Sequence, residues 1–186
     1  MKKTEALAAM DENMETALSM MASHSLRRTY VIHRDHRPSM PAVIPAVPDE
    51  SMQGVRTLIR HISDVMVSDA VSMLVPVSIT VPGIGQTMAL VAGMKWRDNA
   101  SSSVECLIRA VGVSHNPDGT ISCLHIEPNG MEEFVNEAMD GVLSPVRPDV
   151  YSVAYARDML ARKGHMSPEL DAAIDGDDDL AAPTVH

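Results

Sequence analysis

The segment 52–127 constrains the fold of this chain more than any other part of the sequence. It opens with apolar residues at the three- and four-residue spacing of an amphipathic helix, and it continues through β-rich runs. Near its end stands Asn116-Pro117-Asp118-Gly119. Proline presets φ in a type I turn, and glycine takes the left-handed position of the bulge that follows. The tetrapeptide therefore predicts a β-hairpin spanning 104–127.

The turn type also predicts the register of this hairpin. Because side chains alternate between the two faces of a strand, fixing one cross-strand pair fixes all the others. The predicted pairs are Asn116 with Thr120, Val111 with His125, and Arg109 with Glu127. The alternation then places five residues on the face that we expect to be the core: Cys106, Ile108, Ala110, Leu124 and Ile126.

Helices and further strands are expected around the hairpin. Apolar periodicity predicts helices over 4–22, 52–66, 131–140 and 149–163, and β-branched runs predict strands over 29–34, 70–81 and 87–97. Pro76 should place its strand at a sheet edge or at a bulge, because proline cannot donate to a β-ladder. The order of these elements favours an α+β fold, with one mostly antiparallel sheet and helices packed on one face.

The same patterns suggest how the chain is divided. Residues 1–24 form an N-terminal amphipathic helix, and 25–165 form the core domain. This domain includes a proline-rich connector over 38–48. Residues 166–186 carry six acids and no Lys or Arg, so we expect a disordered acidic tail there.

The N-terminal helix carries a narrow apolar stripe, typical of a helix that packs against one partner helix. This stripe predicts self-association as a homodimer or a higher assembly. The alternative is that the helix docks on its own domain. The stripe consists of Leu7, Met10, Met14, Leu18 and Met21.

The overall charge excludes some classes of partner. The formal net charge is -10, which disfavours nucleic acid, because phosphate binding needs clustered basic residues. No apolar run is long enough for a membrane span, and no secretory leader is recognisable, so we expect a cytoplasmic protein.

One basic segment stands out in this acidic chain. Arginine favours bidentate contacts to phosphate or carboxylate, so the segment is a candidate anion site. The alternative is a solvated basic loop. A metal site is a weaker hypothesis, since only His33 and His36 lie close together and zinc needs three or four ligands. The candidate anion-binding residues are Arg27, Arg28, His33, Arg34, His36 and Arg37.

No residue pattern indicates catalysis. The chain lacks a nucleophile elbow, a phosphate-binding loop and a closely spaced metal-binding motif, so we assign no catalytic residue and no cofactor. Cys106 and Cys123 fall on opposite faces of the hairpin, which disfavours a disulfide between them.

We therefore expect a non-enzymatic, self-associating interaction protein, of the kind found among accessory proteins of bacteria and phages. Its partners would be a second copy and another protein. The alternative is a small ligand-binding domain or enzyme, with an anion or metal site around His33–Arg37.

Overall fold

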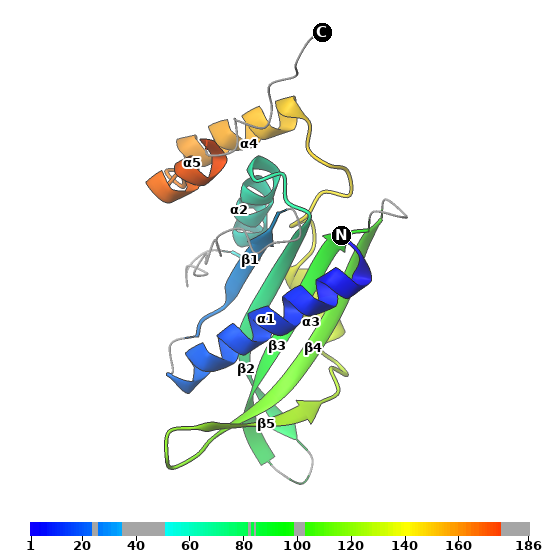
Figure 1. The fold of residues 1–186 in the computed structure, drawn as a ribbon, viewed down its shortest axis with the longest axis vertical. Helices are drawn as coiled ribbons and strands as arrows, with labels where there is room; N and C mark the ends of the chain where they lie inside the picture. The colour runs from blue at the N-terminus through cyan, green and yellow to red at the C-terminus, as the bar shows by residue number, and fades with distance from the viewer. Residues whose placement is uncertain (24–25, 35–50, 82, 84, 99–102, 176–186) are drawn as a thin grey trace.

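The computed structural model shows an α+β fold with a single five-stranded antiparallel sheet (Figure 1). It describes residues 1–23, 26–34, 51–81, 83, 85–98 and 103–175. The strands run in chain order across the sheet, as in a meander. They are β1 (Thr29–His33), β2 (Ala70–Val81), β3 (Gly85–Arg97), β4 (Val104–His115) and β5 (Ile121–Ile126).

Five helices accompany the sheet in the described part of the chain: α1 (Lys3–Ala22), α2 (Met52–Val65), α3 (Glu132–Ala138), α4 (Val150–Arg162) and α5 (Pro168–Asp175). Helix α2 begins where the Ser51 hydroxyl accepts a hydrogen bond from the Gly54 N–H at 3.2 Å. Asp149 caps α4 in the same way. These caps satisfy backbone donors that a helix N-terminus otherwise leaves without a partner.

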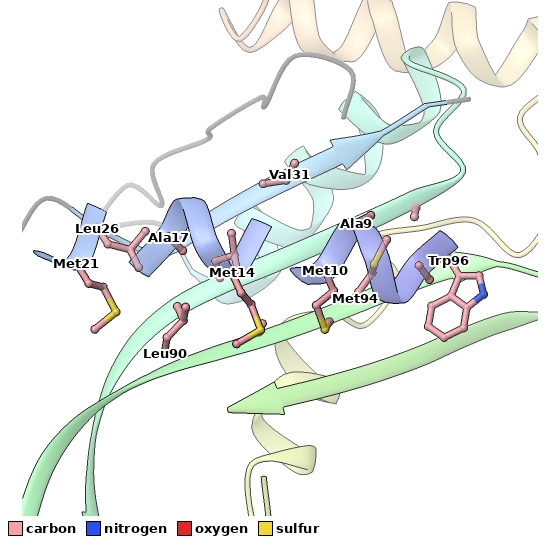
Figure 2. Close-up of a cluster of buried hydrophobic side chains, with 14 of the residues drawn as sticks. Ala9, Met10, Met14, Ala17, Met21, Leu26, Val31, Leu90, Met94 and Trp96 are labelled. Carbon is pink, nitrogen blue, oxygen red and sulfur yellow. The ribbon is translucent and has the colours of Figure 1, made fainter. Parts of the chain in front are cut away.

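The fold class is therefore confirmed, but the helices cover both faces of the sheet. Helices α2 and α3 pack on one face, as expected for the core domain. Helix α1 packs on the other face, against β2 and β3. Figure 2 shows two of its buried methionines beside residues of β3, Met10 next to Met94 and Met14 next to Leu90.

The apolar stripe of α1 thus belongs to the core of its own chain. Met10, Met14 and Met21 are buried, whereas Leu7 and Leu18 are only half-buried. Docking was the alternative interpretation of this stripe, and the structure supports it. The stripe is therefore no longer an argument for self-association.

The hairpin register is confirmed. Val111 faces His125, and the Asn116 N–H donates to the Thr120 carbonyl at 2.8 Å. Gly119 has a φ of +83°, the left-handed conformation that the turn requires. The turn chemistry was therefore sufficient to set the pairing of β4 with β5.

The face assignment of this hairpin holds only in part. Ala110 is buried, and Ile108 and Ile126 are half-buried against the α2 and α3 side. The expectation that Cys106 and Leu124 belong to the core is wrong, because both residues are exposed. No helix in the described residues covers these two positions, so alternation alone predicts the face but not its burial.

Pro76 lies in a strand that is internal to the sheet, yet at a position where that strand has one neighbour. Strand β1 pairs with β2 only from Ala70 to Leu74. Pro76 lies beyond this pairing and faces Leu90 of β3 on the other side. β2 is locally an edge there, which explains how proline is tolerated.

The C-terminal helices pack on α2. Helix α4 buries Ala156 and Leu160, and Met166, Leu170 and Ile174 pack against the same cluster. Helix α5 occupies part of the segment that the sequence assigned to a disordered tail, so this boundary was placed too early. Residues 176–186 and the connector 38–48 lie outside the described residues. No described helix combines the length and apolarity needed to span a bilayer.

Arg109 forms an ion pair that the sequence did not predict. Its guanidinium contacts the carboxylate of Asp11 on α1, while Glu127 lies near His125, with 3.6 Å between the Glu127 Oε1 and His125 Nε2 atoms. The expected partnership of Arg109 with Glu127 is therefore wrong, although the strand register that suggested it is right.

This ion pair gives a first testable prediction. Reversing Asp11 or Arg109 alone should destabilise the fold by about 0.2–1 kcal/mol, because the pair is solvent-exposed. The double reversal should recover most of that loss in urea denaturation. Glu127→Lys serves as the matched control, and coupling of Arg109 to Glu127 rather than to Asp11 would contradict the structure.

Candidate functional site: a groove between α1 and the outer strands

A hollow in the described part of the protein lies between α1 and the strands β4 and β5. Its volume is about 680 Å³. Helix α1 packs mainly over β2 and β3, so the outer two strands are only partly covered on this face (Figure 1). The groove is therefore a direct result of how α1 crosses the sheet.

One side of the groove comes from α1. Its residues recur at spacings of three and four, which places them on one side of a helix. Met14 and Leu18 supply the apolar contact, one turn apart. The residues contributed by α1 are Asp11, Met14, Glu15, Leu18, Ser19 and Ala22.

The other side comes from the hairpin. Val111 and Ile121 both pack against the α1-side core cluster and are half-buried. Four consecutive residues of β4, from Ile108 to Val111, line the groove. The residues contributed are Ile108, Arg109, Ala110, Val111, Ile121, His125, Ile126 and Pro128.

Charged groups stand at the margins of the groove. Asp11 and Arg109 neutralise each other. Glu15 is exposed, and no basic side chain in the described residues forms an ion pair with it. The exposed Glu127 lies beside His125. The groove is therefore apolar inside and carries a small excess of negative charge at its rim.

A second hollow, of about 290 Å³, lies near the C-terminal end of α1. It is lined by Met21, Leu26, Pro76, Met88 and His115. Met88 is exposed, because the hairpin of β2 and β3 extends beyond the end of the helix there. Apolar surface thus continues past the groove toward the tip of this hairpin.

The structure does not bring the described members of the predicted anion site together. Arg28 lies over the ring of Phe134, with 5.7 Å from its guanidinium carbon to the ring centroid. Arg34 follows the other end of β1, six residues after Arg28. Six residues of extended chain span about 20 Å, so the two arginines lie far apart. Arg27 is exposed. His36 and Arg37 lie outside the described residues, so a site that includes them stays a prediction.

His33 is the clearest departure from the sequence-based expectation. It was assigned either to a ligand site or to a solvated loop, but it ends β1 and is fully buried. Its Nε2 atom lies 3.1 Å from the Asn13 side-chain amide and 2.9 Å from the Ser72 hydroxyl. Its Nδ1 atom is buried without a hydrogen-bond partner in the described structure.

This buried cluster links α1 to the sheet. An amide NH₂ group can only donate, so with Asn13 donating, Nε2 of His33 accepts and the ring proton lies on Nδ1. Burial lowers the pKa of His33 to about 4. A serine beside a histidine resembles a catalytic pair, but both residues are enclosed, so a substrate has no access to them.

The remaining candidates from the sequence do not form a site within the described residues. No three His, Cys, Asp or Glu side chains there lie close enough to hold a metal ion. Both cysteines are free and exposed, and Cys123 shares β5 with the exposed His125.

Helix α4 presents an apolar surface that the sequence analysis did not single out. Val150, Tyr151 and Tyr155 are all exposed on it. Tyr155 makes an edge contact with His61 of α2, at 6.1 Å between the ring centroids. Exposed aromatic residues are common at protein interfaces.

Comparison with known proteins identifies no relative. No family model matches the chain, and neither a curated protein nor a solved structure is similar to it.

Proposed function

We propose that this chain is a non-enzymatic interaction protein, and that it binds an amphipathic segment of a partner protein in the groove between α1 and β4–β5. The observation that carries this proposal is the apolar groove of about 680 Å³. Its volume lies in the range of surface clefts that hold specific ligands.

The shape of the groove favours a peptide segment over a compact molecule. Along α1 it extends from Asp11 to Ala22, which corresponds to about 16 Å of helix. That length accommodates about three turns of a partner helix. Apolar side chains at helical spacing in the partner would contact Met14, Leu18 and Val111.

The residue types at the groove support the same assignment. Aliphatic side chains such as Leu18, Val111 and Ile121 line it, and grooves of this kind receive the apolar face of an amphipathic helix. The excess negative charge at Glu15 and Glu127 favours a partner with basic residues beside its apolar stripe. The C-terminal segment of this chain is acidic and therefore lacks the basic residues that such a partner needs.

Self-association remains part of the proposal, but it needs a surface other than the α1 stripe. The stripe is occupied by the sheet of the same chain.

The groove is tested with two labelled helical peptides of about 15 residues, one built from Leu and Lys and one from Leu and Glu. By fluorescence anisotropy, the basic peptide should bind at least about tenfold more tightly. Leu18→Lys and Glu15→Lys should each weaken its binding by about tenfold or more, because they place positive charge at the contact.

The matched control is Val146→Lys, which changes an apolar residue that is 72% exposed and lies outside the groove. It should leave the peptide affinity unchanged. Circular dichroism verifies that each variant is folded. Equal binding by the Leu18→Lys and Val146→Lys variants would refute the groove as the binding site.

A further inference from the structure

We propose that two copies of this chain associate through strand β5, in an antiparallel pairing about a twofold axis that places Cys123 opposite its counterpart. This inference goes beyond the groove and does not depend on it. It follows from the exposure of β5, from the backbone groups of β5 that point away from β4, and from the residue types of this strand.

Strand β5 is the open edge of the sheet. The strand order places β1 and β5 at the two edges. All five residues of β1 are buried, whereas four of the six residues of β5 are exposed. Among the exposed residues of β5 is a large apolar one, Leu124, which is 47% exposed. Of the two edge strands, β5 is therefore the accessible one. The part of β2 beyond Leu74 also lacks a neighbour on one side, but Pro76 interrupts the donors of that edge.

The hydrogen-bond pattern shows which backbone groups point outward. Antiparallel neighbours alternate between hydrogen-bonded and non-bonded pairs. The Asn116 N–H donates to the Thr120 carbonyl, so this pair and every second pair after it bond within the hairpin. The residues between them direct their N–H and C=O groups away from β4: Ile121, Cys123 and His125.

The strand has none of the residues that usually protect an edge. Monomeric proteins block exposed edges with Lys, other charged side chains, proline or a bulge. The sequence of β5 is Ile-Ser-Cys-Leu-His-Ile, without Lys, Arg, Asp, Glu or Pro. Glu127 and Pro128 follow only after the strand has ended.

A second copy of β5 fits this edge better than an unrelated strand, because the strand is complementary to itself. A twofold axis perpendicular to the sheet keeps the α1 faces of both copies on the same side. With Cys123 opposite Cys123, Ile121 lies opposite His125, and all three outward residues of each copy form bonded pairs. If the register of the two strands shifts by two residues, at least one of the three outward residues faces a position outside β5.

This pairing also opposes no like charges across the strands. Strand β5 carries no formal charge with His125 neutral, although each chain carries a net charge of -10. The strands attract through backbone hydrogen bonds and apolar contact, while the two molecules repel each other at long range. Added salt screens that repulsion, so association should strengthen with ionic strength.

The first test is mass and its dependence on β5. Light scattering and sedimentation should show a concentration-dependent dimer, of twice the chain mass of 20.1 kDa, with a dissociation constant on the order of micromolar. Cys123→Lys places two lysines opposite each other, and Cys123→Pro removes an outward N–H group. Each should raise the dissociation constant by about tenfold or more, whereas Cys123→Ser should not change it.

The second test is a crosslink that depends on the register. Directly opposite Cα atoms in a bonded pair are about 5.5 Å apart. A short bismaleimide should therefore join two copies of the Cys106→Ser variant, which retains Cys123. It should not join copies of the Cys123→Ser variant, because Cys106 is also exposed but lies on β4, far from the axis.

Three results would overturn the proposal. One is a monomer at all concentrations up to the hundreds of micromolar, on the order of the weakest specific associations. Another is a dimer that tolerates both Cys123→Lys and Cys123→Pro, with crosslinking through Cys106. The third is a dimer that is lost instead in Tyr151→Asp, which would assign the interface to α4. Thermal denaturation of each variant separates loss of the dimer from loss of the fold.

Discussion

Lowering the pH from about 7 to about 4 should remove about 3 kcal/mol of folding stability through His33 alone. His33 is fully buried, and burial lowers its pKa from 6.5 to about 4 in the folded protein. A difference of that size between the folded and unfolded states corresponds to a few kcal/mol, because each pKa unit is worth about 1.4 kcal/mol.

The direction of the effect follows from the order of proton uptake. As the pH falls below 6.5, the unfolded chain binds a proton at His33 while the folded protein does not. The stabilising contribution is therefore complete above pH 6.5, declines between pH 6.5 and about 4, and is lost below that. Protonation also disrupts the cluster, because an imidazolium cannot accept the hydrogen bond from Asn13.

Urea denaturation at a series of pH values measures this effect. Many carboxylates titrate in the same range, so the relevant quantity is the difference between wild type and His33→Gln. The free energy of unfolding of wild type should fall more steeply between pH 6.5 and 4. His125→Gln is the matched control, because it makes the same substitution at an exposed histidine. Parallel curves for wild type and His33→Gln would contradict the buried, neutral state of His33.

The parts of the fold that the sequence predicted correctly are those that depend on local chemistry. The register of β4 with β5 follows from one turn, because Pro117 and Gly119 restrict the backbone to one geometry. The start of α2 follows from the cap at Ser51. In both cases the controlling residues lie within a few positions of the structure that they determine.

The parts that the sequence did not predict depend on contacts between distant segments. The periodicity of α1 shows which side of the helix is apolar, but not which surface covers it. His33 is the sharpest case, since its two partners, Asn13 and Ser72, lie 20 and 39 residues away. A polar residue at the end of an apolar strand looks exposed until its neighbours are known.

The groove could not have been inferred from the sequence for the same reason. Met14 and Leu18 were recognised on one stripe, and Val111 was placed in the hairpin. Their convergence follows only from the way α1 crosses the sheet. The same crossing would connect the two proposals. If two β5 strands pair about a twofold axis, two grooves lie on one face of a ten-stranded sheet, each bordered by its own α1.

The role of α1 as part of the core gives the second large prediction. Met10→Ala should destabilise the fold by about 2–5 kcal/mol, because the side chain is 1% exposed and its removal leaves a cavity against Met94 and Trp96. Leu7→Ala lies one turn earlier on the same stripe, but Leu7 is only half-buried, so its cost should be well below about 1.5 kcal/mol. Urea denaturation gives both values.

The pair of variants separates the two interpretations of the stripe. If α1 is held by its own sheet, the cost of Met10→Ala is independent of protein concentration, and the oligomeric mass of the folded protein does not change. If the stripe were instead a seam between two chains, Leu7→Ala and Met10→Ala would have similar costs, and both would weaken the dimer. The deep burial of Met10 beside the half-buried Leu7 favours the first outcome, because the helix is then rotated to face the sheet rather than a second helix.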